Sequence, residues 1–206
     1  MADSQDAFSD QDSNASAGST TGHLFIVSAP SGAGKSTLCR AVRRCLTNLH
    51  YSVSYTTRSA RQGEREGIDY HFISHAEFQR GIRERRWAEW AEVHGNYYGS
   101  SSRWIEHTLK SGGDILMDID LQGARQMVSR FPEAVTVFIM PPSLEELERR
   151  LRGRGTDDEQ DIELRLKNAR QEIAQREFCR HVIVNDDLAQ ATQALSALIQ
   201  EYRQRR

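Results

Sequence analysis

Apolar positions recur along the chain with two different spacings, and together they predict an alternation of strands and helices. Continuous apolar runs, typical of strands buried on both faces of a parallel sheet, occur at residues 24–28, 115–120, 134–140 and 181–185. Apolar residues three or four positions apart predict amphipathic helices over residues 36–49 and 188–203. This order indicates an α/β fold, in which helices flank a central parallel sheet.

Residues 52–102 interrupt this alternation. They are richer in Tyr, Arg, Gly and Ser, and their apolar runs are short. Ser74-His-Ala-Glu77 forms a capping box, which predicts a helix over residues 78–86. The stretch Gly95-Asn-Tyr-Tyr-Gly99 is expected to be rich in turns. We therefore interpret this region as a small α+β insertion on the core.

Residues 149–167 form a second interruption, in which five arginines stand close to an acidic run. The capping box Ser143-Leu-Glu-Glu146 predicts that these arginines begin on a helix. Gly153 and Gly155 are candidate hinges. A solvated charged face and a mobile arginine-bearing lid both agree with this composition.

Composition argues against several classes of protein. A chain of 206 residues suits one domain with a sizeable core, and its formal net charge of −2 argues against a dedicated nucleic-acid binder. Residues 1–22 contain four acidic residues and no Lys or Arg, so we expect a disordered acidic tail without the features of a secretory signal. No apolar stretch approaches the ~18 residues needed to span a membrane. Three cysteines without metal or redox spacing indicate reduced thiols in a cytoplasmic protein.

The strand predicted over residues 24–28 leads directly into Ala29-Pro-Ser-Gly-Ala-Gly-Lys-Ser36. A glycine-rich turn followed by Lys and Ser, between a strand and a helix, is typical of a P-loop, although the strict pattern begins with Gly where Ala29 stands. Gly32 and Gly34 let successive backbone N–H groups point at a polyphosphate. Lys35 would reach the β- and γ-phosphates, and the Ser36 hydroxyl would bind Mg²⁺. The sequence therefore predicts a nucleotide site that uses Mg²⁺, although a P-loop alone indicates a nucleotide and not a reaction.

A second block of motifs extends this interpretation. T-T-R-x-x-R-x-G-E occupies residues 56–64 and precedes G-x-x-Y-x-F at 67–72. Further blocks stand at residues 89–92, 95–100, 118–123, 150–155 and 185–187. With these motifs in this order, the chain resembles guanylate kinases over residues 23–203. The resemblance implies transfer of the γ-phosphoryl group of ATP to GMP, giving ADP and GDP, and a role in purine nucleotide metabolism.

The resemblance also implies how GMP is held. In guanylate kinases, residues matching Arg58, Arg61, Tyr70 and Tyr98 bind the acceptor phosphate, and guanidinium forks and phenolic hydroxyls suit that anion. A carboxylate matching Glu89, with a second polar contact from Ser54, accepts the adjacent N1–H and N2–H₂ donors of guanine.

Glu92 competes with Glu89 for the guanine contact, because it lies one helical turn later. If the segment is a strand, Glu89 and Glu92 face opposite sides and only one can serve. The resemblance favours Glu89.

Asp118 and Asp120 end the apolar run at 115–120, where ligands bind in open α/β sheets. Period-two spacing puts both on one face if the strand stays regular. By resemblance, Asp118 holds Mg²⁺ through water and Asp120 points toward the acceptor nucleoside, although the division of roles between them is open.

The resemblance assigns the remaining residues by role. The expected catalytic residues are Lys35, Arg150, Arg154 and Arg165. The expected ATP-binding residues are Ala29, Pro30, Ser31, Gly32, Ala33, Gly34, Lys35, Ser36, Thr37, Asn185 and Asp186. The expected GMP-binding residues are Ser54, Arg58, Arg61, Tyr70, Glu89, Tyr98, Ser100 and Asp120, and the expected metal-binding residues are Ser36 and, via water, Asp118.

The chain is accordingly divided into a P-loop NTPase core and two additions. We expect a disordered tail at 1–22, core at 23–51, 103–145 and 171–206, a GMP-binding region at 52–102 and a helical lid at 146–170. The expected partners are ATP and GMP, with no nucleic acid, membrane or obligatory protein partner; homo-oligomer formation is left open.

Three other readings share part of this pattern. A guanylate-kinase-like scaffold would bind phosphopeptides but typically lacks a working P-loop. A kinase for AMP or dTMP would not carry the whole set of acceptor motifs. A nucleotide switch or motor ATPase is disfavoured, because residues 52–102 supply a second phosphate site. The expected catalysis is positioning and charge stabilisation of the phosphoryl group, with arginines closing over it and excluding water.

Overall fold

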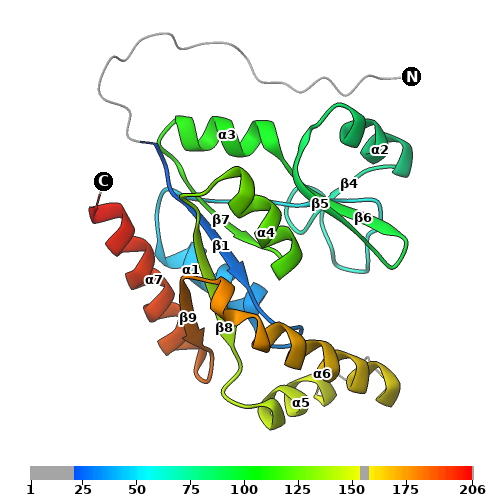
Figure 1. Ribbon diagram of the computed structural model, residues 1–206, viewed down its shortest axis with the longest axis vertical. Coiled ribbons are helices and arrows are strands. Elements are labelled where there is room, and N and C mark those ends of the chain that lie inside the picture. Colours follow the sequence, from blue (N-terminus) through cyan, green and yellow to red (C-terminus); the bar gives the residue numbers. More distant parts are fainter. Residues whose placement is uncertain (1–20, 154–157, 206) are drawn as a thin grey trace.

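Five parallel strands form the central sheet of the computed structural model, which describes residues 21–153 and 158–205. Their order is β2-β7-β1-β8-β9, so that β1 lies in the middle (Figure 1). The strands are β1 Leu24–Ser28, β2 Leu49–Tyr51, β7 Asp114–Asp118, β8 Val135–Met140 and β9 His181–Val184. The predicted α/β fold with a central parallel sheet is confirmed.

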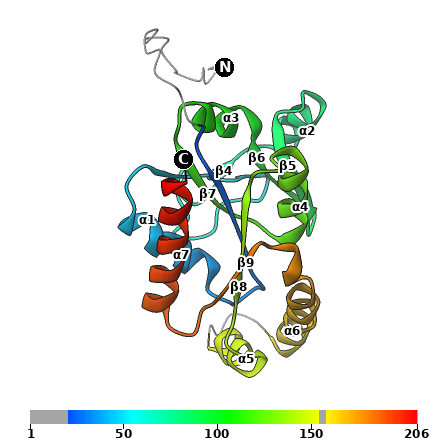
Figure 2. The ribbon, with the colours of Figure 1, turned by 60° about the vertical axis from the view of Figure 1, so that its left-hand side comes forward.

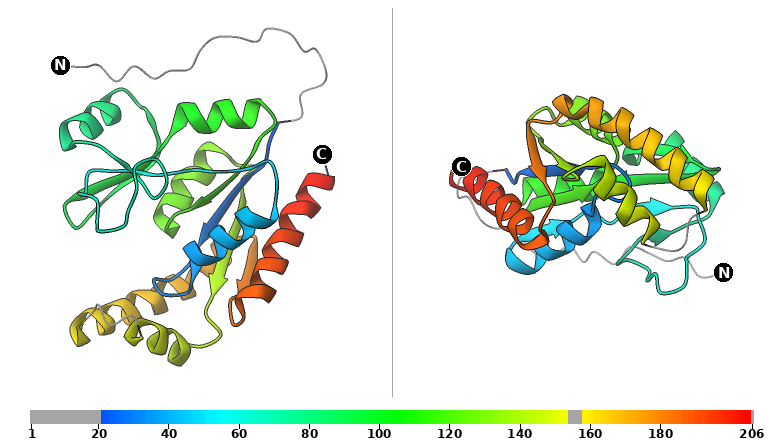
Figure 3. Two further views of the ribbon diagram at one scale, coloured as in Figure 1. Left: turned by 180° about the vertical axis from the view of Figure 1, so that it is seen from behind. Right: turned by 90° about the horizontal axis from the view of Figure 1, so that it is seen from below.

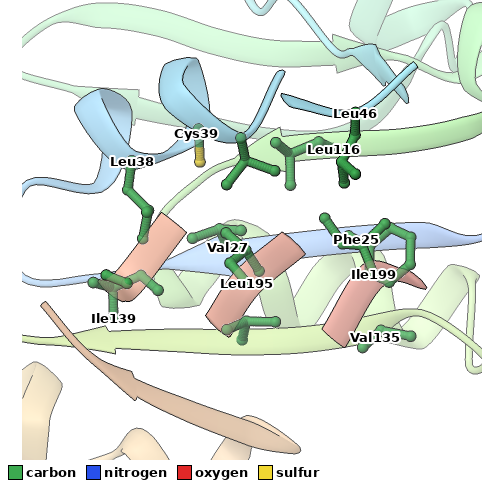
Figure 4. Close-up of a cluster of buried hydrophobic side chains, with 13 residues drawn as sticks. Phe25, Val27, Leu38, Cys39, Leu46, Leu116, Val135, Ile139, Leu195 and Ile199 are labelled. Atoms are coloured by element: carbon green, nitrogen blue, oxygen red, sulfur yellow. The ribbon is translucent and has the colours of Figure 1, made fainter. Parts of the chain in front are cut away.

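Helices cover both faces of this sheet (Figure 3). Helices α1, Lys35–Cys45, and α7, Leu188–Gln204, lie on one face, and α3, Ser102–Lys110, and α4, Leu121–Arg130, lie on the other. Side chains alternate along β1, so that Phe25 packs toward α1 and α7 whereas Ile26 packs toward α3 and α4. Figure 4 shows the first of these clusters, in which Leu38 of α1 and Leu195 of α7 converge on the sheet.

A second, smaller sheet carries the insertion. Its strands are β3 Tyr55–Thr56, β4 His71–Phe72, β5 Trp87–Val93 and β6 Asn96–Ser101, in the order β4-β3-β6-β5. The β3–β4 pair is parallel, and the pairs β3–β6 and β5–β6 are antiparallel. Helix α2, His75–Arg83, packs on this sheet through Phe78, whose ring stacks on Trp87 and Tyr97. The predicted α+β insertion is confirmed.

Helix α4 joins the small sheet to the core, and Figure 2 shows it beside β5. The Gln126 side chain accepts a hydrogen bond from Trp90 N at 3.2 Å and donates one to Trp90 O at 3.0 Å. Arg130 donates to Trp87 O at 3.3 Å and to Ser102 Oγ at 2.7 Å. The insertion is therefore fixed to the core along β5.

Helices α5, Leu144–Arg152, and α6, Glu159–Ala174, lie on the same side of the core as the small sheet (Figure 1), and the 3₁₀ helix Arg176–Phe178 follows them. The N-caps of α5 and α6 are Ser143 and Asp158, which accept from backbone N–H groups three residues later. Leu147 and Leu151 pack against Ala169 between the two helices. The prediction that the arginine run begins on a helix is confirmed.

Several predicted boundaries are wrong. The helix expected over 36–49 ends at Cys45, because Asn48 has a left-handed backbone with φ 53° and Leu49 already pairs with β7. The strand expected over 115–120 ends at Asp118, so that Asp120 does not continue its period-two spacing. The region 95–99 is a turn only at its start, and 96–101 is strand β6. The helix expected over 78–86 begins earlier, at His75, and ends at Arg83, since Arg85 has a φ of 54°.

Two findings bear on the composition. No helix within residues 21–153 and 158–205 is long and apolar enough to cross a membrane. The thiols of Cys39, Cys45 and Cys179 are free, as expected. Most of the expected tail, residues 1–20, and Arg154 and Gly155 lie outside the described residues.

Candidate active site

The P-loop connects β1 to α1 at the carboxyl edge of the central sheet. Gly32 and Gly34 have left-handed backbones, with φ 95° and 89°, a conformation that residues other than glycine rarely adopt. A Cβ at Gly34 would lie 2.5 Å from Asn185 Nδ2, and a Cβ at Gly32 would lie 2.8 Å from a Leu151 methyl group. Both glycines are therefore required by conformation and by space.

The loop after β9 and two arginines, from α5 and α6, border the P-loop. Asn185, which follows β9, donates from Nδ2 to Ala33 O at 2.8 Å. Arg150 of α5 donates to Asn185 O at 3.0 Å and to Asp186 O at 3.4 Å. Arg165 of α6 donates to Ser31 Oγ at 3.4 Å. The structure thus brings Arg150, Arg165, Asn185 and Asp186 to the P-loop, whereas Arg154 lies outside the described residues.

The start of α1 faces the end of β7. Lys35 Nζ donates to Ile119 O at 3.1 Å, and Ser36 Oγ donates to Asp118 Oδ2 at 2.8 Å. The Tyr51 hydroxyl donates to the other carboxylate oxygen, Asp118 Oδ1. Burial and the Asp118 charge raise the pKa of Tyr51, so that its phenol keeps its proton.

The Ser36 and Asp118 side chains suit a Mg²⁺ ion whose remaining ligands are phosphate and water oxygens. Mg²⁺ prefers oxygen ligands and is commonly held by one or two protein groups together with phosphates and water. The Ser36 hydroxyl and the Asp118 carboxylate are such oxygens in direct contact. Within the described parts of the chain, no group of three or more His, Cys, Asp or Glu side chains could hold a metal ion.

A polar cavity of about 640 Å³ lies beside the P-loop. Its lining includes Lys35, Ser36 and Asp118 from the core and Ser54, Glu64 and Tyr70 from the insertion. Arg40, Arg43 and Arg44 of α1 complete one wall. The cavity therefore joins the predicted donor site to the predicted acceptor site.

One wall of this cavity carries Tyr70, and Arg58 and Tyr98, which are also predicted to bind the acceptor phosphate, lie next to the Tyr70 ring. The Arg58 guanidinium lies 5.4 Å from the centre of the Tyr70 ring, and the Tyr70 and Tyr98 rings are 6.0 Å apart. Burial raises the pKa of Tyr70, and Asp118 and Tyr98 add to this shift, so that its hydroxyl remains a donor. The Arg61 side chain is exposed nearby.

Glu64 organises this wall, although the motif analysis gave it no role. It forms a bidentate ion pair with Arg58 at 3.0 and 2.8 Å and accepts from the Arg61 backbone at 2.8 Å. These contacts hold the pKa of Glu64 below its usual range, with the Arg58 hydrogen bond as the main cause. The T-T-R-x-x-R-x-G-E spacing contained the signal, since its final acid lies six residues after Arg58.

The choice between Glu89 and Glu92 follows from the strand. Residues 87–93 form β5, in which Glu89 is 5% exposed and Glu92 faces solvent. Ser100 Oγ donates to Glu89 Oε1 at 2.7 Å. Burial raises the pKa of Glu89 to about 7, and the Asp120 charge adds to it, while Ser100 and Lys35 oppose it. Glu89 is therefore the buried acid of the insertion.

Two neighbours shape the space around Glu89. Asp120 is the N-cap of α4 and accepts from Gly123 N at 2.7 Å, which corrects its expected place on the strand. A Cβ at Gly123 would lie 3.0 Å from Glu89 Oε2. Gly123 leaves room for the carboxylate, a role that sequence reasoning missed although the glycine stood in a quoted motif.

A P-loop at the carboxyl edge of a parallel sheet, facing a second set of arginine and tyrosine side chains, defines a P-loop kinase that phosphorylates a small molecule. A family model described as guanylate kinase matches residues 21–202. The chain belongs to the guanylate kinase family. Its activity is the conversion of ATP and GMP to ADP and GDP.

Individual relatives agree with this family. The guanylate kinase of Aromatoleum aromaticum is 50% identical over 185 residues, which cover 89% of this chain and 90% of the relative. That of Dechloromonas aromatica is 49% identical over 178 residues, which cover 86% and 88%. The crystal structure of guanylate kinase from Anaplasma phagocytophilum superimposes with a TM-score of 0.73 at 35% identity, covering 89% of this chain and 87% of that one.

The comparisons confirm the resemblance inferred from the motifs. They favour the guanylate kinase reading over a phosphopeptide-binding scaffold, a kinase for AMP or dTMP, and a nucleotide switch or motor ATPase.

Proposed function

We propose that ATP binds along residues 29–37 and GMP binds within 52–102, with their phosphates meeting in the 640 Å³ cavity. One observation carries this proposal: Lys35 and Ser36 line the same cavity as Ser54 and Tyr70. In-line transfer needs the attacking oxygen within ~3–3.5 Å of the γ-phosphorus, so both phosphates must share one space.

The acceptor itself supplies the nucleophile in this mechanism. A nucleoside monophosphate has a second pKa near ~6, so its phosphate oxygen is largely anionic at neutral pH and needs no general base. Arg58, Arg61, Tyr70 and Tyr98 hold that phosphate. The Glu64 ion pair supports this role, because it fixes the Arg58 guanidinium beside Tyr70.

Cations from the core and the helical pair stabilise the transferring phosphoryl group. Lys35 contacts the β- and γ-oxygens. Arg165 of α6 contacts the P-loop at Ser31, and Arg150 of α5 contacts the neighbouring Asn185 loop, which supports the assignment of residues 146–170 as a lid. Arg154 has the same role by sequence alone. Asn185 and Asp186 border the ATP site from the loop that also contacts Ala33.

Mg²⁺ accompanies ATP in this proposal. Ser36 would hold it directly and Asp118 through water, in keeping with their oxygen donors. When bound, the ion neutralises charge on the transferring phosphates.

Guanine is recognised by Glu89, with Ser54, Ser100 and Asp120 as further contacts to the nucleoside. An ionised Glu89 accepts from N1–H and N2–H₂ of guanine at once, whereas adenine offers an acceptor N1 and no amine at position 2. A buried acceptor left unpaired by the wrong base can discriminate by ~10⁴.

An ADP-release assay with ATP, Mg²⁺ and each of GMP, AMP, CMP, UMP and dTMP tests the proposal. Of these five acceptors, wild-type protein should phosphorylate only GMP. Glu89→Gln should impair GMP use far more than ATP binding, and Glu92→Gln, on the exposed side of the same strand, should behave as wild type. Equal losses in GMP and ATP binding for Glu89→Gln would mean that Glu89 is structural.

A further inference from the structure

Tyr51 is the last residue of β2, an edge strand of the central sheet, and pairs with Leu116 of β7 two residues before Asp118. Its hydroxyl donates to Asp118 Oδ1, while Ser36 Oγ donates to Asp118 Oδ2. Each oxygen of this carboxylate is thus held by a side chain from a different element. None of the motifs used to assign the site includes Tyr51.

The phenol is itself held in place. Tyr51 is half-buried on the wall of the cavity, and the Arg43 guanidinium lies 4.2 Å from the centre of its ring. That distance is typical of a cation–π contact. The pairing of β2 with β7 fixes the Tyr51 backbone, and the Arg43 guanidinium covers its ring. The Tyr51 hydroxyl therefore has a fixed direction toward Asp118.

We propose that Tyr51 is a positioning residue that orients the Asp118 carboxylate toward the divalent cation bound with ATP. The inference rests on the proposed assignment of Ser36 and Asp118 to that cation. A hydroxyl has one proton and two lone pairs, so Ser36 can donate to Asp118 while its oxygen faces a metal. Ser36 leaves the second carboxylate oxygen unrestrained, and Tyr51 fixes it. Partners of this kind commonly change metal affinity by ~10–100-fold.

Tyr51→Phe removes only the hydroxyl and keeps the ring that Arg43 covers. Tyr202→Phe is the matched control, because Tyr202 OH contacts His181 Nε2 at 3.0 Å and lies outside the cavity lining. Calorimetry would measure ATP affinity in EDTA and across a series of Mg²⁺ concentrations. Mg²⁺ should enhance ATP affinity, and for Tyr51→Phe we expect the Mg²⁺ concentration that gives half of this enhancement to rise by about tenfold or more. Its ATP affinity in EDTA should match wild type, and Tyr202→Phe should match in both conditions.

Turnover and melting provide further readouts. The kcat of Tyr51→Phe should recover at saturating Mg²⁺, because orientation of the carboxylate affects metal affinity first. The melting temperature should rise less with Mg²⁺-ATP than in wild type, and equally with ATP in EDTA. An unchanged Mg²⁺ dependence would overturn the proposal. So would a melting temperature lowered equally with and without Mg²⁺-ATP, since the hydroxyl would then be structural.

Asp118→Asn, measured in parallel, separates this inference from the assignment on which it rests. If Asp118→Asn shifts the Mg²⁺ dependence and Tyr51→Phe does not, only the role of Tyr51 is wrong. If neither variant shifts it, both the assignment of Asp118 and the role of Tyr51 are wrong.

Discussion

Ser100 and Glu89 face each other on neighbouring strands β6 and β5, and a 2.7 Å hydrogen bond joins the Ser100 hydroxyl to the Glu89 carboxyl group. The carboxyl group is almost fully enclosed, and burial raises its pKa from 4.5 to about 7. The Glu89 carboxyl group, which is the proposed acceptor for guanine, therefore titrates within the physiological pH range. Its protonation should be visible in both stability and binding.

We expect the free energy of unfolding of the nucleotide-free protein to fall between about pH 5 and about pH 8 because of Glu89. The folded state holds this proton more tightly than the unfolded chain, so the stabilisation is complete below pH 4.5 and is lost as the pH rises through about 7. The shift corresponds to about 3 kcal/mol. Urea unfolding at several pH values would measure it.

Glu89→Gln should remove this component of the pH profile, and Glu92→Gln should leave it in place, because Glu92 is exposed. Identical profiles for wild type and Glu89→Gln would contradict the raised pKa.

Lys35→Ala should lower kcat with GMP by at least ~10³, the loss expected when a cation that stabilises the transition state is removed. Lys35 contacts Ile119 O in addition to its proposed phosphate role, so the melting temperature should be recorded with the rate. Near-normal turnover in folded Lys35→Ala would refute the P-loop assignment.

Gly123→Ala should raise the KM for GMP by roughly tenfold and leave the KM for ATP unchanged, because the new Cβ would lie 3.0 Å from Glu89 Oε2 and displace the carboxylate. Alanine favours a helix over glycine by about 1 kcal/mol, so weaker GMP binding would not reflect a weaker α4. Steady-state kinetics would test this, with Gln122→Ala on the exposed side of the same turn as control. An unchanged KM for GMP would show that the carboxylate tolerates the methyl group.

Arg203→Ala should lower the free energy of unfolding by about 3–5 kcal/mol without changing either KM, because the buried Asp114 carboxylate loses the guanidinium that neutralises its charge, although it keeps the hydrogen bond from His23 N at 2.8 Å. Arg203 Nε donates to Asp114 Oδ2 at 2.7 Å, and the Asp114 side chain is 1% exposed. Urea unfolding would measure the loss. Arg205→Ala removes an exposed ion pair with Glu201 and should cost less than about 1 kcal/mol. Equal effects of the two substitutions would contradict the importance of the buried pair.

Long buried elements were predictable from sequence and short ones were not. The apolar run at 24–28 matches β1. A strand buried on both faces is apolar along its whole length, so the ends of the apolar run give the ends of the strand. Strands β3 and β4 have two residues each and exist only through partners elsewhere, since Tyr55 pairs with both His71 and Gly99. No local pattern announces such strands.

The residues of the site were likewise predictable where they lie close together in the sequence and not where they lie far apart. Local spacing identified the P-loop, and the resemblance to guanylate kinases identified residues 56–64 as an acceptor motif, because the residues of each motif are close in sequence. The pairing of Glu64 with Arg58 emerged only from the structure. The alternation of a strand decided between Glu89 and Glu92 once β5 was known. Tyr51 and Asp118 stand 67 residues apart, and only the pairing of β2 with β7 brings them into contact. A single sequence contains no signal for such a pair.

The side chain of Gln126 imitates a neighbouring strand. A primary amide offers the same donor and acceptor as a peptide group, and Gln126 exchanges both bonds with Trp90, as a partner strand would. Strand β5 is an edge of its sheet and exposes Trp90 and Val93. Apolar edge strands recruit further strands and start aggregation unless their backbone groups are covered. One glutamine on α4 therefore blocks β5 from adding a strand of another molecule at Trp90.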